Sequence, residues 1–206
     1  MGIINKLLQN PHLWQLSQKI FGDDNEKMQL YKSVIKRKCK LLDFGCANGN
    51  TFPIFSKYDY YGYDTDKIMI SDANKKYKNY KNAHFYLVDI LKKKSPEKNF
   101  DNILFALTGH HINNTTLVRI FFELAKILKK NGKILYFDSI RTNKDSLLLK
   151  SILNFDQGKY IRTLKEYKII KNKLPKNLKL TKEKLYQVKG TFMPQPKYMF
   201  WEIKKI

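Results

Sequence analysis

The chain has 206 residues, a size that fits one α/β domain, and 43% of them are hydrophobic, which is enough for a substantial core. Its longest apolar stretch is far shorter than the ~18 residues of a membrane span, and we expect no secretory signal peptide. The formal net charge of +22 favours a polyanionic partner such as RNA or a membrane surface, but only four of the 40 basic residues are arginine.

Lysine carries most of this positive charge, and it accompanies abundant Asn, Ile, Tyr and Phe. This composition is typical of the codon usage of an AT-rich genome, which explains the charge without a partner. The charge is nevertheless uneven, because residues 141–206 hold 17 basic and 5 acidic residues. We favour codon usage over a polyanion-binding patch and keep both interpretations open.

The cysteines and histidines indicate neither disulfides nor a metal. Cys39 and Cys46 are the only cysteines, and we expect both to be free thiols in a reducing, cytoplasmic compartment. The four histidines have no metal-ligand spacing, so we expect no metal site.

Residues 10–40 are predicted to be helical. Apolar side chains recur at helical spacing over residues 10–40, and Gly22 with the two aspartates after it breaks the pattern into two helices. The first helix could cover a ligand site as a lid. Packing into the core would explain its Trp14 equally well.

Strands and helices are then predicted to alternate. Thr51 and Pro53 suit a helix start, Asp66 suits the N-cap of a helix over residues 67–80, and Asn131-Gly132 suits the end of the helix that opens at Asn114. The predicted strands cover residues 40–45, 60–64, 83–89, 102–107 and 133–137. This alternation predicts an α/β fold with a doubly wound parallel sheet.

After Asp138 the pattern loosens. Helices are predicted over residues 146–154 and 162–173, and two final strands over 178–188 and 198–203. No internal repeat or low-complexity linker is present, so we expect a single domain.

The turn after the first strand is the most informative segment. Residues 41–50 read Leu-Leu-Asp-Phe-Gly-Cys-Ala-Asn-Gly-Asn, and Asp64 at the end of the second strand follows Gly45 by 19 positions. Glycines let a backbone approach a ligand closely, and an acidic residue about 20 positions further on can accept hydrogen bonds from a ribose diol. The arrangement therefore predicts a nucleoside site at the carboxyl ends of two neighbouring parallel strands.

The spacing of the glycines indicates which nucleoside the predicted site binds. A dinucleotide fingerprint would place a third glycine at position 50, where this chain has Asn50. The segment instead resembles motif I of class I S-adenosylmethionine (SAM) methyltransferases, with Ala47 in place of the usual middle glycine. The resemblance covers residues 41–140 and implies a seven-stranded, mostly parallel, Rossmann-like sheet with an antiparallel edge strand and N-terminal helices. It implies one domain over residues 1–206: a helical lid (1–40), a SAM-binding core (41–140) and a substrate-side tail (141–206).

The resemblance implies SAM as the cofactor and a role for several residues. Asp64 would hold the ribose hydroxyls, Asp89 would face the adenine amino group with Ile90 on the ring, and Asp43 would order the loop and the ligand's ammonium end. For Asp89, a helix cap is the alternative. The implied cofactor-binding residues are Asp43, Gly45, Cys46, Ala47, Asn48, Gly49, Asp64, Thr65, Asp89, Ile90, Leu107 and Thr108.

The end of the fourth strand carries the candidate for catalysis. His111 in the sequence Gly-His-His-Ile is our first candidate for general base or substrate contact, because imidazole titrates near neutral pH. His110 is a weaker candidate, and both could equally serve packing. The segment lacks the Asn/Asp-Pro-Pro-Tyr/Phe and Pro-Cys boxes of two large classes of nucleic-acid methyltransferase.

Residues 156–163 resemble an Asp-x-Gly-x-Tyr-x-Arg stretch of small bacterial methyltransferases of uncertain substrate. Such a segment could fold over the acceptor pocket, with Tyr160 as a wall and Arg162 holding an acidic or phosphorylated acceptor. The alternative is a surface turn in which Asp156 and Arg162 pair.

These observations predict a SAM-dependent methyltransferase that acts on a small molecule, such as a sugar or a lipid-linked intermediate. An RNA methyltransferase is the first alternative, favoured by the charge and disfavoured by the fourth strand. A SAM-binding protein without catalytic activity is the second. The acceptor, the atom methylated and the oligomeric state stay open.

Overall fold

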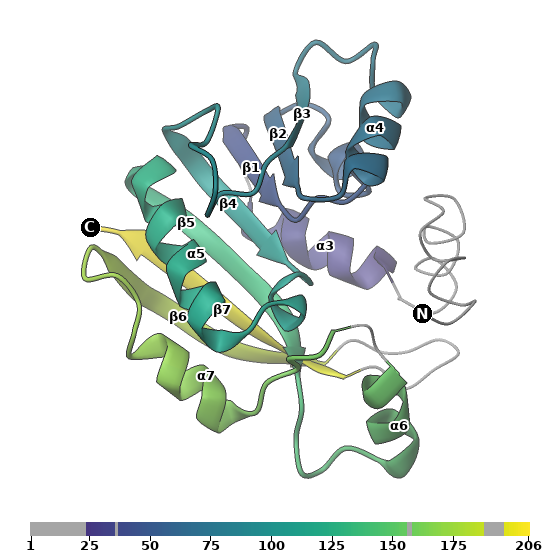
Figure 1. The fold of residues 1–206 in the computed structure, drawn as a ribbon, viewed down its shortest axis with the longest axis vertical. Coiled ribbons are helices and arrows are strands. Elements are labelled where there is room, and N and C mark those ends of the chain that lie inside the picture. Colours follow the sequence, from purple (N-terminus) through teal and green to yellow (C-terminus); the bar gives the residue numbers. More distant parts are fainter. Residues whose placement is uncertain (1–23, 36, 156–157, 188–195) are drawn as a thin grey trace.

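Seven strands form one sheet. They are Lys40–Phe44 (β1), Asp59–Asp64 (β2), Ala83–Leu87 (β3), Phe100–Ala106 (β4), Leu128–Ile140 (β5), Leu178–Gln187 (β6) and Lys197–Lys205 (β7). Their order is β3-β2-β1-β4-β5-β7-β6 (Figure 1). β1 to β5 are parallel, whereas β7 is antiparallel to both β5 and β6. The predicted doubly wound, mostly parallel sheet is therefore confirmed, and its antiparallel pair lies at the β6 edge.

The structure is a computed structural model that describes residues 24–35, 37–155, 158–187 and 196–206. The helices in these ranges are α3 (Asp24–Val34), α4 (Lys67–Lys76), α5 (Asn114–Ile127), α6 (Leu147–Phe155) and α7 (Leu164–Lys171), with short 3-10 helices η1 (Phe52–Phe55) and η2 (Gly109–His111). The second predicted N-terminal helix is confirmed as α3. The first, with Trp14 and most of the proposed lid, lies outside the described residues.

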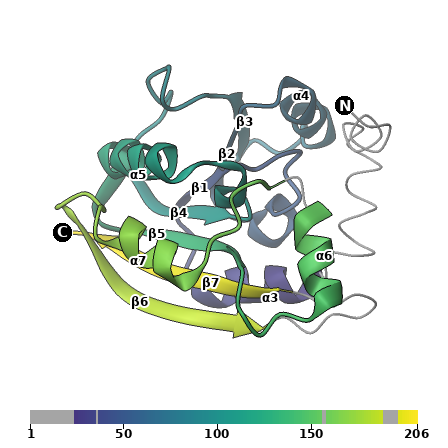
Figure 2. The ribbon, with the colours of Figure 1, turned by 60° about the horizontal axis from the view of Figure 1, so that its bottom comes forward.

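Helices cover both faces of the sheet (Figure 2). Adjacent residues of a strand point to opposite faces, so Leu42 packs in one apolar cluster with α5 and α7, while Leu41 packs in the other with α3 and α4. Both leucines are fully buried. Burial on both faces explains why the parallel strands are apolar with little alternation.

Local capping explains two of the helices. Asp66 accepts hydrogen bonds from the backbone N–H groups of Ile68 and Met69, so the predicted N-cap of α4 is confirmed. α5 begins after Asn113, whose side chain accepts from the Thr116 N–H.

One predicted helix signal was wrong, and a second was confirmed in part, because a helix does start after Thr51 with Pro53 in its first turn. α5 ends at Ile127 because the chain turns into β5 there, where Leu128 pairs with Phe100 of β4; Asn131-Gly132 therefore lies inside the strand. Thr51 makes no side-chain cap, because its hydroxyl donates to Asp43 instead, and only a 3-10 helix of four residues follows.

The absences expected from the sequence can be examined in the described part of the chain. Cys39 and Cys46 are both free thiols. Within the described ranges, no group of three metal-ligating side chains occurs. No helix among the same residues is long and apolar enough to cross a bilayer.

Candidate cofactor and acceptor site

The loop after β1 turns sharply through three residues with positive φ. The φ angles are +81° at Gly45, +46° at Ala47 and +77° at Gly49. At Gly45 a Cβ atom would lie 2.2 Å from the Thr108 hydroxyl oxygen, so only glycine permits this contact between the β1 and β4 ends. Ala47 adopts the same left-handed conformation at a cost of about 1 kcal/mol. The sharp turn of this loop therefore depends on three residues that adopt a left-handed backbone conformation.

Asp64 ties the end of β2 to this loop. One carboxylate oxygen accepts from the Ala47 N–H at 2.8 Å, and the other accepts from the Asp66 N–H at 2.9 Å. The side chain is half-buried at the tip of the strand, and the exposed Thr65 follows it. Because a carboxylate has about four acceptor positions, Asp64 retains capacity for two further donors such as a ribose diol.

Asp43 anchors the loop through its buried carboxylate. Its carboxylate is buried and accepts from the Tyr60 hydroxyl at 2.5 Å and from the Thr51 hydroxyl. Burial raises the pKa of Asp43 to about 6, although the two hydroxyl donors oppose the shift. These contacts order the loop as predicted, while a contact with the ligand's ammonium group stays a prediction.

Two amide oxygens in the same loop are buried without a hydrogen-bond partner among the described residues. They are the Oδ1 atoms of Asn48 and Asn50, and the Nδ2 of Asn48 donates to Asp72 at 3.0 Å. A buried acceptor without a partner costs about 1–3 kcal/mol. A ligand with amine and hydroxyl donors, such as SAM, would supply partners here, so the residues of the loop fit the predicted cofactor.

The other predicted cofactor residues lie at neighbouring strand ends. Asp89 is half-buried after β3, accepts from the Leu91 N–H at 3.1 Å and pairs with Lys92 at 3.1 Å; the chain continues as a turn, so Asp89 caps no helix. Ile90 beside it is buried. Cys46 is also buried, which raises the pKa of its thiol and makes this side chain a packing residue of the loop.

The tip of β4 holds a strained backbone. Leu107 has a φ of +51°, which is unusual for a bulky residue, and its N–H donates to the Phe137 carbonyl at 2.8 Å. Thr108 follows and packs against Gly45. Strain of this kind concentrates at functional sites, and here it lies between the loop after β1 and the histidine turn.

The two histidines of η2 have different surroundings. His110 is buried, and its Nδ1 lies 2.5 Å from a carboxylate oxygen of Asp138. His111, the predicted catalytic residue, is exposed, and its ring centroid lies 4.3 Å from that of His110. A buried carboxylate therefore fixes the imidazole of His110.

Asp138 belongs to the site, although its sequence position predicted only a strand end and no role. It is fully buried at the end of β5 and accepts from the Tyr136 hydroxyl at 3.0 Å and from the Ser139 N–H at 2.9 Å. Burial by itself raises the pKa of Asp138, but the charge of His110 and these hydrogen bonds lower it overall. Its position at a strand end, where ligands bind in such sheets, was the available signal.

Arg162 has a different role from the predicted contact with an acceptor. Its guanidinium is 1% exposed and donates to the carbonyls of Gly109 (2.8 Å) and Ile112 and to the side chain of Asn114 (2.8 Å). Arg162 therefore holds the η2 turn in place and does not present its charge to a ligand. The alternative partner, Asp156, lies outside the described residues.

Tyr160 joins the tail to the same turn. Its backbone N–H donates to the His110 carbonyl at 2.8 Å, and its side chain is 42% exposed. The structure thus brings Tyr160, His110 and His111 together beside the strand ends that carry the loop residues.

This strand order, the antiparallel β7 and the glycine turn after β1 define a class I methyltransferase fold. A family model described as a methyltransferase domain matches residues 35–189, which is more than half of the chain. The chain belongs to this methyltransferase family and is a SAM-dependent enzyme of class I. No curated protein matches it significantly.

Solved structures share the fold at low identity. The N-methyltransferase NodS from Bradyrhizobium japonicum WM9, in complex with S-adenosyl-L-homocysteine (SAH), is 16% identical with a TM-score of 0.71, over 98% of this chain and 96% of that one. A protein that converts a disulfide bond into a thioacetal group during echinomycin biosynthesis is 14% identical (TM-score 0.69, 87% and 80% covered). The [4+2]-cyclase SpnF is 11% identical (TM-score 0.69, 87% and 80% covered). At these identities the likeness shows the fold alone, and the cyclase illustrates that one fold supports different reactions.

Proposed function

We propose that this enzyme transfers a methyl group from SAM to a small-molecule acceptor, such as a sugar or a lipid-linked intermediate, at the tips of β4 and β5. The observation that carries the proposal is the buried His110–Asp138 pair beside the exposed His111. Two proteins that share the fold support the proposal: NodS is described as an N-methyltransferase, and the second protein is described by a conversion during echinomycin biosynthesis.

The loop after β1 and the strand tips beside it would bind the cofactor. Gly45 and Gly49 allow close backbone approach, Asp64 would accept the ribose hydroxyls, and the unpaired oxygens of Asn48 and Asn50 would accept from the ligand's donors. SAM supplies a methyl group on a positively charged sulfur, so the carbon to be transferred is already activated. The chain's own task is to position the acceptor and to exclude water.

The histidine turn would serve the acceptor. Asp138 fixes the Nδ1 side of His110, and His110 in turn packs against His111. If the acceptor is a hydroxyl, His111 is placed to take its proton, because it is the exposed imidazole of the pair. If the acceptor is an amine, the same ring would orient the nucleophile instead.

An assay with radiolabelled SAM tests the proposal. The purified enzyme is incubated separately with the small-molecule fraction of a cell extract and with bulk tRNA. We expect label in the small-molecule fraction only. Label in tRNA, with binding that weakens steeply as salt rises, would establish the RNA alternative. Tight SAH binding without label in either fraction would contradict both acceptor classes.

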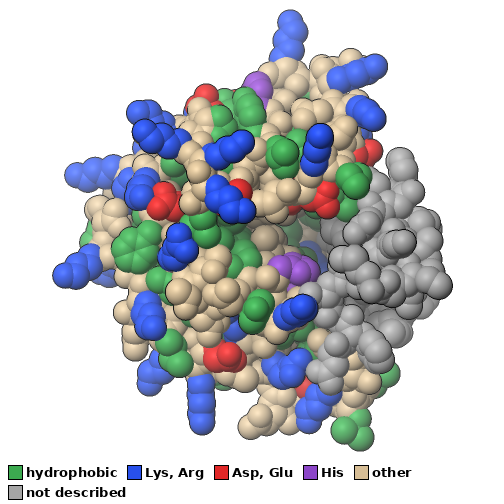
Figure 3. All heavy atoms as spheres, viewed as in Figure 1, with side chains coloured by type: hydrophobic (Ala, Val, Ile, Leu, Met, Phe, Trp, Pro, Cys, Tyr) green, Lys and Arg blue, Asp and Glu red, His purple; other side chains and the backbone are tan. Residues whose placement is uncertain are grey.

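The positive net charge favours an RNA acceptor, but its distribution over the face shown in Figure 3 does not. Figure 3 shows the Lys and Arg side chains spread over this face of the molecule rather than gathered in one patch. Nucleic-acid sites usually concentrate their positive charge along one groove or face. The small-molecule acceptor is therefore our first choice.

Two variants separate the roles of the histidines. For His111→Ala we expect a fall in kcat of about a hundredfold, the usual contribution of general acid–base catalysis, with little change in SAH affinity. For His110→Ala we expect a loss of thermal stability as well, because Asp138 then becomes a buried charge without its partner. Unchanged turnover in His111→Ala would exclude His111 from catalysis.

A further inference from the structure

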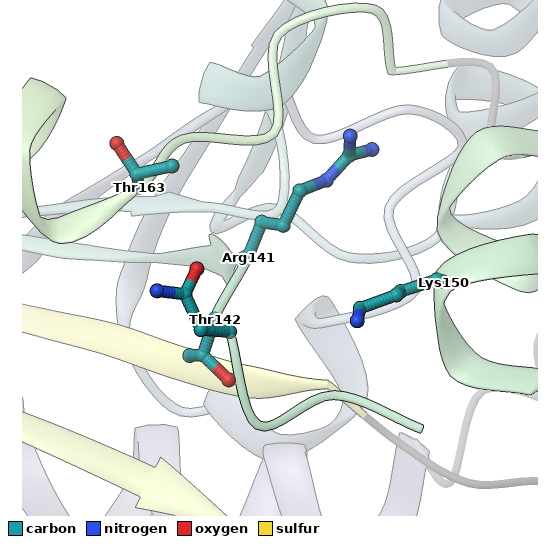
Figure 4. Close-up of a pocket in the computed structure, with 5 residues that line it drawn as sticks. Arg141, Thr142, Lys150 and Thr163 are labelled. Carbon is teal, nitrogen blue, oxygen red and sulfur yellow. The ribbon is translucent and has the colours of Figure 1, made fainter. Parts of the chain in front are cut away.

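Two hollows in the described surface differ in their link to the loop after β1. One lies between the chain after β5 and α6, with a volume of about 480 Å³ (Figure 4). Asp145 binds the Thr142 side chain in its wall. Glu166 does the same with Thr163, so carboxylates as well as cations border this space, and its charge does not specify a ligand. The other, of about 350 Å³, runs along α4, and its wall residue Asp72 binds the loop directly.

Three consecutive residues of the loop after β1 are held by the segment from the end of β2 to the end of α4. Each makes one hydrogen bond to a side chain of that segment: the Ala47 N–H to Asp64 (2.8 Å), the Asn48 Nδ2 to Asp72 (3.0 Å) and the Gly49 carbonyl to the Tyr77 hydroxyl (3.0 Å). Ala47 has a left-handed backbone, so these bonds hold the loop where it would otherwise relax.

The contact with Asp72 fixes how the amide group of Asn48 lies. An ionised carboxylate only accepts hydrogen bonds, so the Nδ2 atom of the amide faces Asp72 and the Oδ1 atom lies on its other side. The Asn48 side chain is 1% exposed, and its Oδ1 has no hydrogen-bond partner among the described residues. A cofactor that donates to this oxygen would therefore meet an acceptor that is already oriented.

Tyr77 holds the next residue of the loop through its hydroxyl group. Burial raises the pKa of Tyr77 to about 12, and the charge of Asp72 adds to the shift, so the hydroxyl stays a donor at neutral pH. The Tyr77 ring stacks on Phe85, with centroids 5.5 Å apart, and a Cβ atom at Gly49 would lie 2.9 Å from it. Ring packing therefore fixes the hydroxyl, and glycine at position 49 permits the close contact.

The charge of Asp72 is accompanied by opposite charges. The exposed Lys67 and Lys75 line the α4 hollow together with it. Their positive charge reduces the field of Asp72 at the loop. We therefore expect its hydrogen bond to Asn48, rather than a long-range attraction of the cofactor, to be its main effect.

We propose that Asp72 and Tyr77 are positioning residues for the cofactor, which hold Asn48 and Gly49 in the arrangement that binds it without contacting it themselves. The inference rests on the proposed function, because it uses the placement of the cofactor at the loop after β1. A loop that is already held in its bound arrangement loses less conformational freedom on binding, so both contacts should raise the affinity.

Calorimetry with SAH on the full chain tests the inference. We expect Asp72→Ala to weaken SAH binding about tenfold, and Tyr77→Phe, which loses a neutral hydrogen bond, about threefold. Asp72→Asn keeps an acceptor for Asn48 and should lose less affinity than Asp72→Ala. Ser71→Ala and Tyr80→Phe, at exposed positions nearby, are matched controls that should bind like the wild type.

Two further measurements separate positioning from other roles. A positioning residue should affect SAM and SAH equally, whereas an attractive charge would favour the cationic SAM. In the ligand-free chain, hydrogen exchange at residues 47–49 should be faster in Asp72→Ala, while exchange in α5 stays unchanged. Wild-type SAH affinity in both Asp72→Ala and Tyr77→Phe, as for a merely structural role, would overturn the inference, and so would a larger loss for SAM than for SAH.

Asp64→Ala distinguishes this inference from the proposed placement of the cofactor. If Asp64→Ala weakens SAH binding while Asp72→Ala and Tyr77→Phe do not, only the positioning role fails. If all three variants bind SAH like the wild type, the placement of the cofactor fails as well. Methyl transfer to tRNA, with weakened SAH binding in Asp72→Ala and Tyr77→Phe, would contradict the proposed acceptor and support the positioning role.

Discussion

The cofactor side and the acceptor side of this site are built in different ways. On the cofactor side the contacts are short in sequence: Asp43 binds the Thr51 hydroxyl 8 positions away, and Asp64 binds the Ala47 N–H 17 positions away. On the acceptor side, His110 and Asp138 are 28 positions apart, and Arg162 binds the Gly109 carbonyl across 53 positions. The first side is a turn closed mainly by local hydrogen bonds, and the second side is completed only when Arg162 of the tail binds the histidine turn.

This difference bears on function as well as on folding. A local turn with fixed backbone geometry can be kept while the rest of a chain changes, which suits a cofactor common to many enzymes. The proposed acceptor side depends on a turn that is held by a distant arginine. Changes in the tail should therefore alter acceptor binding and leave cofactor binding intact.

The largest effect should come from the distant arginine. We expect Arg162→Met to lower the free energy of unfolding by about 3–5 kcal/mol, because two carbonyls and one side-chain oxygen lose their buried donor. Denaturant unfolding measures this loss, and Arg119→Met, at an exposed position of α5, is the control. A stable Arg162→Met enzyme with a raised acceptor KM would instead show that Arg162 contacts the acceptor.

The cofactor side should respond through affinity. We expect Asp64→Ala to weaken SAH binding about a hundredfold, or about 3 kcal/mol, because the ribose loses a charged acceptor and the Ala47 N–H loses its partner. Calorimetry measures the affinity, and circular dichroism should show the fold retained. Asp59→Ala, at the exposed start of the same strand, is the control. An Asp64→Ala enzyme with wild-type affinity would remove Asp64 from the cofactor site.

The buried carboxylate of the loop predicts a pH dependence of stability. The pKa of Asp43 is about 6 in the folded protein and about 4 when unfolded, so the folded state binds this proton more tightly. Its contribution to stability is therefore best below about pH 4 and declines as the pH rises to about 6. In Asp43→Asn, whose amide oxygen can still accept both hydroxyls, this decline of about 2–3 kcal/mol should vanish. Parallel stability curves for the two proteins between pH 4 and 7 would contradict the shift.

The smallest effect concerns the backbone of the loop. Ala47→Gly should raise the free energy of unfolding by up to about 1 kcal/mol, because glycine adopts the +46° φ without strain, less the greater freedom it gives the unfolded chain. SAH affinity should stay within about twofold of wild type. A clear loss of stability would show that the methyl group of Ala47 contributes packing that outweighs the strain.

Two predicted helix ends show what a local sequence pattern can and cannot predict. Asp66 is predicted as a cap because an Asp side chain before a helix can accept hydrogen bonds from the first N–H groups of that helix. Such a contact spans only three residues. Asn131-Gly132 has an equally strong local signal for a helix end, yet Leu128 already pairs with Phe100 of β4, and Asn131, with a φ of +64°, lies in the irregular stretch before Lys133 pairs with Asn102. A signal for a turn is local, whereas the partner strand that ends the helix at Ile127 is remote in the sequence.

The site residues show the same contrast between local and remote contacts. Asp43, Gly45, Gly49 and Asp64 could be selected from the sequence because backbone chirality and strand ends impose their residue types within about 20 positions. The role of Arg162 could not be predicted from the sequence. A guanidinium suits a phosphate and three buried carbonyl or amide oxygens equally well. Its burial decides between them, and burial arises only after the tail packs on the sheet.

By itself, the sequence determined the alternation of strands and helices, the glycine turn and the acidic residue that follows it, because each depends on short-range sterics and hydrogen bonding. Only the tertiary structure decided that His110 pairs with a buried carboxylate, and that the guanidinium of Arg162 is buried against the Gly109 carbonyl. The reason is physical: the charge state and accessibility of a side chain depend on which remote segments exclude water from it, and no spacing along the chain specifies that.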